Sequence, residues 1–219
     1  MHIPDGLMAP AVSALGWVVA VAVLYVSLRK VRGRIEEKDI PLMAVLGAGI
    51  FVAQMLNFPI GGGTTGHLVG AALAAVLLGP YAAVLVITSI LIIQCFMFGD
   101  GGITALGLNI TNMAVVGSFT GGLIYRYLGS RNRGAAVFVG SWLAVFLGAI
   151  LCSIELAVSY GISGGAYGIP GGIAIPAMAG YHALIGIGEG IIATGVVSFI
   201  SQAAPEIMNI GRKEAVPDA

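Results

Sequence analysis

Charged side chains are scarce in this sequence. Lysine, arginine, aspartate and glutamate together make up 9% of its 219 residues, whereas hydrophobic residues make up 58%. A soluble domain of ordinary composition carries about 25% charged residues. So few charges cannot cover the surface of a globule in water, which excludes the usual soluble classes. The formal net charge of zero also gives no reason to expect a nucleic-acid partner.

Cysteine is nearly absent, and two other common signals are missing. Cys95 and Cys152 both lie in apolar runs without metal-type spacing, so we expect buried free thiols. No GxxxxGKS or GxxxxGKT pattern occurs, which predicts that this chain does not hydrolyse ATP. We expect a non-catalytic chain and no organic cofactor. No basic stretch precedes an apolar core at the amino terminus. We therefore expect no cleavable signal peptide and take Met1 as the first residue of the working protein.

Long uncharged runs dominate what is present. Residues 40–99 contain no charged side chain, whereas a bilayer needs about 20 apolar residues per helical span. We therefore predict an all-α, polytopic protein of the cell's inner (plasma) membrane, with a single transmembrane domain over residues 1–219. Hydropathy divides the chain into apolar segments at residues 11–28, 42–58, 67–98, 103–125, 134–160 and 178–200.

The segment 67–98 predicts two short helices rather than one, because Gly79-Pro80 near its middle is a turn signal. This reading gives seven transmembrane helices. Lysine and arginine collect in cytoplasmic loops, and with seven spans the basic clusters at 29–38, 126–133 and 212–213 fall on one side. The sequence therefore predicts an outside amino terminus, an inside carboxyl terminus and a cytoplasmic tail over residues 205–219.

The amino terminus is a chelator by geometry. The Met1 amine, the His2 amide nitrogen and the His2 Nδ1 atom can close two adjacent rings on one metal ion and leave one in-plane position. His67 follows a glycine-rich loop that permits close backbone approach, and it is a candidate for the fourth nitrogen. The alternatives are a frayed terminus that happens to contain histidine, and a His67 that is hydrogen-bonded at the membrane interface.

A few other ionisable residues lie within or beside the apolar segments. His182 and Glu189 are seven residues apart and share one face of the last predicted helix. Such residues are costly in a membrane and are usually functional or paired. A proton or cation relay is one reading, but we favour a pair that fixes helix packing, and we treat Asp100 and Glu155 in the same way.

Five motifs in the sequence are distinctive: MHIPDG (1–6), QMLNFPI (54–60), GTTGHL (63–68), DGGITALG (100–107) and YHAL (181–184). Together they resemble a known family, the substrate-binding membrane subunit (S component) of energy-coupling factor nickel and cobalt transporters, the CbiM/NikM family. The resemblance implies a seven-helix subunit with a metal-binding segment over residues 1–10. It further implies a metal site made by the Met1 amine, the His2 amide and imidazole, and the His67 imidazole.

The resemblance favours nickel as the transported substrate, with cobalt as the alternative. Cobalt members more often begin MHIMEG, so Pro4 and Asp5 point toward nickel. Four nitrogens in a plane also favour Ni(II) or Cu(II) over Co(II). We assign possible supporting roles around the metal to four residues: Asn57, Asp100, His182 and Glu189.

The resemblance also implies partners: a transmembrane coupling subunit, a pair of cytoplasmic ATPases, and in some systems a small accessory membrane subunit. Two rival functions remain open at this point. A proton-coupled secondary transporter would use Glu189 and His182, but it should show repeated halves, and we find no convincing repeat. A membrane metalloenzyme should keep an open metal position, whereas the proposed site fills the plane with protein nitrogens.

Overall fold

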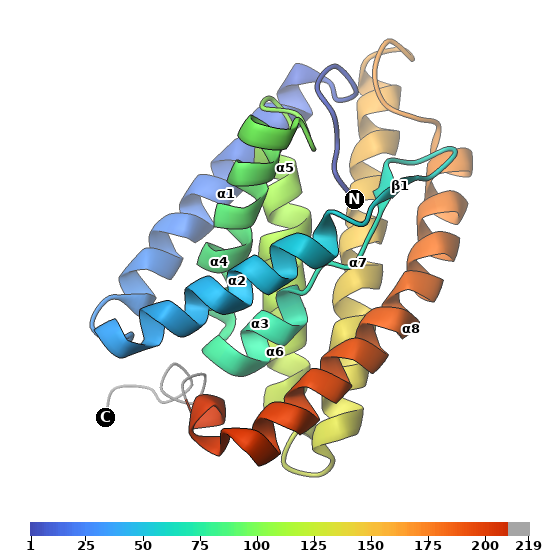
Figure 1. Ribbon diagram of the computed structural model, residues 1–219. Coiled ribbons are helices and arrows are strands. Elements are labelled where there is room, and N and C mark those ends of the chain that lie inside the picture. Colours follow the sequence, from blue (N-terminus) through green and yellow to red (C-terminus); the bar gives the residue numbers. More distant parts are fainter. Residues whose placement is uncertain (210–219) are drawn as a thin grey trace.

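The computed structural model describes residues 1–209, which fold into a bundle of helices (Figure 1). Residues 210–219 lie outside the described part, and with them the basic pair at 212–213 and most of the predicted tail. In chain order the elements are α1 (Pro10–Val31), η1 (Glu37–Asp39), α2 (Ile40–Gln54), β1 (Phe58–Pro59), β2 (Thr65–Gly66), α3 (Ala71–Leu78), α4 (Pro80–Ile93), η2 (Gln94–Phe98), α5 (Leu106–Asn109), η3 (Ile110–Val116), α6 (Gly117–Leu128), α7 (Arg133–Ile162), α8 (Gly171–Ala203) and η4 (Pro205–Asn209).

Proline and glycine set several helix boundaries. Pro10 and Pro80 each occupy the first position of a helix, where the missing N–H costs nothing. Gly79 separates α3 from α4 with a φ of 89°, a conformation that residues with a side chain rarely adopt. The predicted break of the segment 67–98 into two helices at Gly79-Pro80 is therefore confirmed.

The lengths of the helices divide them into two groups. Within residues 1–209, four helices are long and apolar enough to cross a membrane by length and composition, namely Pro10–Val31, Pro80–Phe98, Arg133–Ile162 and Gly171–Ala203. By contrast, α2 is about 22 Å long and α3 about 12 Å, against a hydrocarbon core of about 30 Å. The chain is thus a mostly helical multi-pass membrane protein, and seven full spans stay a prediction.

Two details differ from what the sequence predicts, namely an all-α protein with a last helix that begins at residue 178. Residues 58–66 form a small antiparallel hairpin, in which Phe58 pairs with Gly66 and Pro59 with Thr65. The loop of this hairpin closes when Ile60 N donates to Thr64 O at 2.9 Å. The last predicted segment also begins too late at residue 178, because α8 already starts at Gly171 and carries Pro176 inside its first turns.

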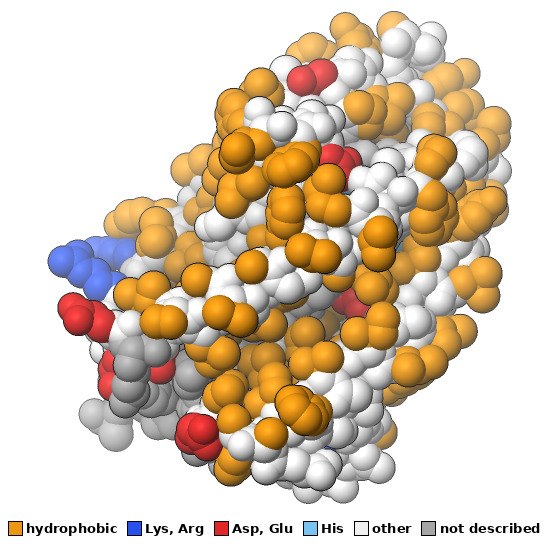
Figure 2. Space-filling view, in the orientation of Figure 1, with side chains coloured by type: hydrophobic (Ala, Val, Ile, Leu, Met, Phe, Trp, Pro, Cys, Tyr) orange, Lys and Arg blue, Asp and Glu red, His pale blue; other side chains and the backbone are white. Residues whose placement is uncertain are grey.

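The helices pack closely where glycine allows it. A Cβ atom on Gly186 of α8 would lie 2.9 Å from Trp142 Cδ1 of α7, and one on Gly190 would lie 2.8 Å from Phe138 Cδ2. The GxxxG spacing on α8 therefore serves helix packing. Hydrophobic side chains are spread over the whole of the face shown in Figure 2, and a cluster of lysine and arginine side chains lies at its left end.

The loops collect at the two ends of the bundle. We call the upper end of the bundle in Figure 1 the terminal end. It contains the loops 4–9, 99–105 and 163–170. Backbone hydrogen bonds join these loops: Gly102 N donates to Ile3 O at 2.8 Å, and Gly168 N donates to Leu7 O at 2.7 Å. The terminal end therefore places the amino terminus beside segments that are distant in sequence.

Candidate metal site

The amino terminus is buried inside the bundle rather than frayed. Met1, His2 and Ile3 are each at most 2% exposed. The chain enters the core because Asp5, in the loop before α1, is fixed to the loop 99–105. Its carboxylate accepts hydrogen bonds from Ile103 N at 3.0 Å and Thr104 N at 2.7 Å. Residues 1–3 are thereby held at a fixed depth.

Thr65 of β2 holds the first two nitrogens of the chain. The Met1 amine donates to Thr65 O at 2.5 Å and to Thr65 Oγ1 at 3.0 Å. The His2 amide donates to the same hydroxyl at 3.0 Å. Two of the proposed donors therefore lie against the strand that immediately precedes His67.

The imidazoles of His2 and His67 stack on one another. Their ring centroids are 4.6 Å apart, with 24° between the ring planes. His67 Nδ1 lies 2.7 Å from Leu68 O and is therefore the protonated nitrogen, which leaves the buried Nε2 with a lone pair and no hydrogen-bond partner in residues 1–209. His2 Nε2 contacts Gln94 Oε1 at 3.1 Å, and the tautomer in which Nε2 donates this hydrogen bond leaves the lone pair on Nδ1. The Nδ1 atom is also the one that the chelate needs.

Burial keeps these nitrogens uncharged. It lowers the pKa of the Met1 amine to about 5, against a weaker opposing effect of Cys152 and Asp100. Burial, and then the neighbouring amine, lower the pKa of His2 to about 3, and they lower that of His67 well below its ordinary value. Metal ligands must carry a free lone pair, so a neutral amine and two neutral imidazoles are ready to bind at pH 7.

Asn109 fixes the backbone at the third residue. Its Oδ1 accepts from Ile3 N at 2.9 Å, and its Nδ2 donates to Ile3 O at 3.2 Å. Both polar atoms of the side chain are therefore used on one residue of the terminal segment. This pairing sets the register of Met1 and His2 against Thr65.

The predicted supporting residues divide into two sets. Asp100 Oδ1 lies 3.3 Å from His2 Nδ1, outside hydrogen-bond geometry, and Asn57 donates to the other oxygen of Asp100 at 2.6 Å. Burial raises the pKa of Asp100, and the terminal amine and Asn57 lower it. Asn57 and Asp100 thus adjoin the site.

His182 and Glu189 lie on α8 and are fully or almost fully buried. His182 Nδ1 lies 2.8 Å from Met178 O of its own helix. Glu189 accepts from Val69 N at 2.6 Å and from Gly70 N at 2.9 Å. It therefore binds the start of α3, just after His67, and the favoured reading of a packing role agrees with this contact.

Three residues at the site escaped the sequence reasoning: Thr65, Gln94 and Asn109. Gln94 begins the π-helical segment η2, and Asn109 directly precedes η3. Such segments are frequent at functional sites. An uncharged polar side chain inside an apolar run was the signal available for Gln94 and Asn109. Residues 1–209 hold no group of three or more His, Cys, Asp or Glu side chains that could bind a metal.

Comparison with known proteins identifies the family. The family described as the cobalt uptake substrate-specific transmembrane region, CbiM, matches residues 2–207. The chain belongs to this family. It is therefore a membrane protein of a nickel and cobalt transport family, and the relatives described next are named as transport proteins rather than enzymes.

Relatives named for nickel and for cobalt both occur. A putative fused nickel transport protein NikMN of Archaeoglobus fulgidus is 45% identical over 208 residues, which cover 95% of this chain and 68% of that protein. A putative cobalt transport protein CbiM of the same organism is 31% identical over 214 residues, covering 96% and 99%. A crystal structure described as a truncated transition metal transporter matches with a TM-score of 0.89 and 38% identity, covering 92% of this chain and 99% of that one.

Proposed function

We propose that this chain captures Ni(II) as the substrate-binding subunit of an ATP-driven energy-coupling factor importer. The Met1 amine, the His2 amide and imidazole, and the His67 imidazole would bind the ion. The observation that carries the proposal is the burial of the terminus, with an uncharged amine against Thr65 and the His2 ring stacked on His67. On metal binding the His2 amide would lose its proton and with it the hydrogen bond to Thr65 Oγ1, whereas the Met1 amine would keep N–H groups that can donate to Thr65.

Nickel is favoured over cobalt for two reasons. An amine, a deprotonated amide and two imidazoles offer four nitrogens, and a planar set of nitrogens suits Ni(II) better than Co(II). Two relatives named for nickel, from Archaeoglobus fulgidus and Rhodobacter capsulatus, are 45% and 39% identical to this chain, whereas a cobalt-named relative from Archaeoglobus fulgidus is 31% identical. Cobalt stays the alternative substrate.

The proposal assigns ATP hydrolysis and coupling to other chains. These are a transmembrane coupling subunit, a pair of cytoplasmic ATPases and, in some systems, a small accessory membrane subunit. The proposed topology has seven transmembrane helices, with the terminal end outside and the clusters at 29–38 and 126–133 inside. The rival proton-coupled transporter is less well supported, because both carboxylate oxygens of Glu189 are occupied by backbone N–H groups.

The His67→Ala substitution tests the site. It removes one ligand and leaves the Met1–Thr65 contacts in place, so we expect nickel affinity to fall at least 100-fold, beyond the 10–100-fold typical of residues behind the ligands. Equilibrium dialysis against Ni(II) on the purified protein measures this. Ser27→Ala, which removes another buried polar side chain near the far end of α1, is the control and should keep both the nickel affinity and the visible absorption spectrum of the bound metal.

Wild-type affinity in the His67→Ala variant would contradict the ligand assignment.

Vesicles that contain this chain alone test the energy source. They should bind nickel without accumulating it, because the chain has no nucleotide-binding pattern. Accumulation driven by a proton gradient would instead support the secondary transporter.

A further inference from the structure

Within residues 1–209, Asp100 is the only carboxylate at ion-pair distance from a proposed metal ligand. Its Oδ1 atom lies 3.3 Å from His2 Nδ1, and the two atoms form no hydrogen bond. Its Oδ2 atom accepts a hydrogen bond from Asn57 Nδ2 at 2.6 Å. One oxygen of the carboxylate is therefore held in place, while the other lies beside the nitrogen that the chelate needs.

The contact between Asp100 and His2 brings two electron-rich atoms together. His2 Nε2 lies 3.1 Å from Gln94 Oε1, and the tautomer in which Nε2 donates to Gln94 leaves a lone pair on Nδ1, beside the carboxylate. Atoms of like partial charge repel each other at this distance. A cation bound to Nδ1 would turn this repulsion into attraction.

No basic side chain in the described part of the chain neutralises Asp100. All ten lysine and arginine residues lie in three clusters, at 29–38, 126–133 and 212–213. The other acid of the terminal end, Asp5, differs in this respect, because its carboxylate accepts hydrogen bonds from Ile103 N, Thr104 N and Thr104 Oγ1. Asp100 therefore keeps a negative charge that the described side chains leave unbalanced.

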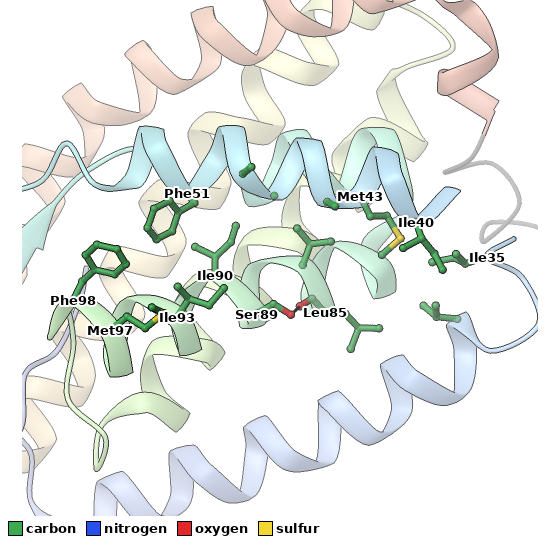
Figure 3. Close-up of a pocket in the computed structure, with 15 residues that line it drawn as sticks. Ile35, Ile40, Met43, Phe51, Leu85, Ser89, Ile90, Ile93, Met97 and Phe98 are labelled. Carbon is green, nitrogen blue, oxygen red and sulfur yellow. Dashed lines mark hydrogen bonds between the residues drawn. The ribbon is translucent and has the colours of Figure 1, made fainter. Parts of the chain in front are cut away.

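Two aromatic rings join the elements that precede Asn57 and Asp100. Phe51 of α2 and Phe98 of η2 have ring centroids 5.3 Å apart, and both line an open groove between α2 and α4 (Figure 3). Asn57 follows α2 and Asp100 follows η2. No charged side chain lines the groove among the described residues, so apolar packing brings the two elements together.

The proposed ligands leave one positive charge to be balanced. Ni(II) carries two positive charges, and the deprotonated amide of His2 supplies one negative charge, whereas the amine and both imidazoles are neutral ligands. The bound complex would therefore be a monocation among residues that are at most 2% exposed. A buried charge is costly unless an opposite charge pairs with it.

Other acidic groups in the described chain are less well placed to supply that charge. Cys152 is near the Met1 amine but is a buried free thiol. Glu155 accepts a hydrogen bond from Asn112 at 2.6 Å, and both oxygens of Glu189 accept from backbone N–H groups. Neither glutamate is at ion-pair distance from a proposed ligand.

We propose that Asp100, oriented by Asn57, is the counter-charge of the transported metal ion. This inference rests on the proposed function, and in particular on binding of the metal by a deprotonated His2 amide. Asp100 adds a negative charge beside the complex and no further bond to the metal. It therefore strengthens binding without changing the ligand set.

The Asp100→Asn substitution tests the charge, because asparagine has the same shape and its amide oxygen can still accept from Asn57. We expect the affinity for Ni(II), measured by competition with a chelator, to fall about 100-fold, the upper end for residues behind the ligands. Cu(II) should lose affinity by the same factor, and the absorption spectrum of bound nickel should stay the same. Glu37→Gln removes an equal charge at the opposite end of α1 and is the control.

Thermal unfolding without added metal separates a counter-charge from a structural role. Removal of a carboxylate that faces a lone pair should not lower the unfolding midpoint of Asp100→Asn. Asn57→Ala keeps the charge but frees the carboxylate, so nickel affinity should fall less, by about tenfold. Cys152→Ser removes the thiol near the amine and should keep the affinity.

Unchanged nickel affinity in Asp100→Asn, together with a loss in His67→Ala, would overturn the counter-charge and leave the proposed site intact. A lower unfolding midpoint would indicate a structural role, and a changed nickel spectrum would indicate direct ligation; either result would overturn the inference. Loss of affinity in Cys152→Ser alone would assign the charge to the thiolate instead. Wild-type affinity in both Asp100→Asn and His67→Ala would contradict the proposed site as well.

Discussion

The terminal segment (residues 1–9) has no regular secondary structure but is buried where it begins, whereas α2 is a regular helix that is largely exposed. Residues 1–9 precede the first helix, yet residues 1–3 are almost fully buried and their backbone polar atoms bond to Asn109, Thr65 and Gly102. By contrast, α2 is a regular helix that buries two of its 15 residues. A membrane tolerates irregular backbone only where protein surrounds it. In this protein the irregular part is therefore the tightly held part, and the regular helix is the exposed one.

We expect the largest loss of nickel uptake when one residue is added at the buried amino terminus. An alanine placed before Met1 would have to enter a filled core or move His2 away from Thr65. The added amide could still allow a chelate of amine, two amides and imidazole. We expect such a protein to retain some nickel or copper binding that no longer depends on His67, and to lose nickel uptake.

Nickel uptake by the full transporter, together with binding to the His67→Ala form of the extended protein, measures this effect. One glycine inserted into the loop 129–132, at the other end of the bundle, is the control and should leave uptake near normal. Normal uptake by the extended protein would show that the Met1 amine is not a ligand.

A smaller effect is expected from Asn109→Ala. This change leaves Ile3 N and Ile3 O buried without their partner, and each unpaired group costs about 1–3 kcal/mol. Part of this cost should weaken the packing of residues 1–3 in the bundle. Nickel affinity, measured by competition with a chelator, should therefore fall about 10–100-fold. Asn132→Ala, which removes an exposed cap of α7, should leave affinity unchanged. Equal losses in both variants would count against a positioning role for Asn109.

The Glu189→Gln change should affect stability rather than the metal. A glutamine has one acceptor oxygen, so either Val69 N or Gly70 N would lose its partner, at a cost of about 1–3 kcal/mol. The midpoint of thermal unfolding should fall, while the absorption spectrum of bound nickel stays the same. The same substitution at the exposed Glu206 is the control. A changed spectrum would place Glu189 among the ligands.

The smallest expected effect concerns the number of protons that are released when the metal binds. Because the Met1 amine has a pKa of about 5 and both imidazoles have lowered pKa values, all three are neutral at pH 7. Only the His2 amide then loses a proton on binding, so affinity should rise about tenfold per pH unit between pH 6 and 8. Below pH 5 the amine protonates and the dependence should steepen. Calorimetry in buffers of different ionisation enthalpy should report about one proton released, and two or more would contradict the neutral amine.

The sequence predicted the parts of this protein that depend on local pattern. The break at Gly79-Pro80 follows from turn chemistry, whereas chelation by the amine and His2 stays a proposal. The common face of His182 and Glu189 follows from helix periodicity, and both side chains are buried on α8.

The contacts that seat the terminus were not predictable in this way. Thr65, Gln94 and Asn109 are 64, 92 and 106 residues from their partners at the terminus. No local rule connects such distant positions. The short length of α3 was also hidden, because the apolar character of 67–70 does not reveal that these residues lie outside the helix.

The wide sequence spacing of the contacts at the terminal end has a consequence for synthesis. The loop before α1 accepts a hydrogen bond from Gly168, about 160 residues later in the chain. At roughly 5–20 residues per second, the ribosome needs about 8–32 s to make that stretch. Residues 1–9 are therefore among the last to find their complete set of partners, and they must wait while nearly all of the following helices enter the membrane.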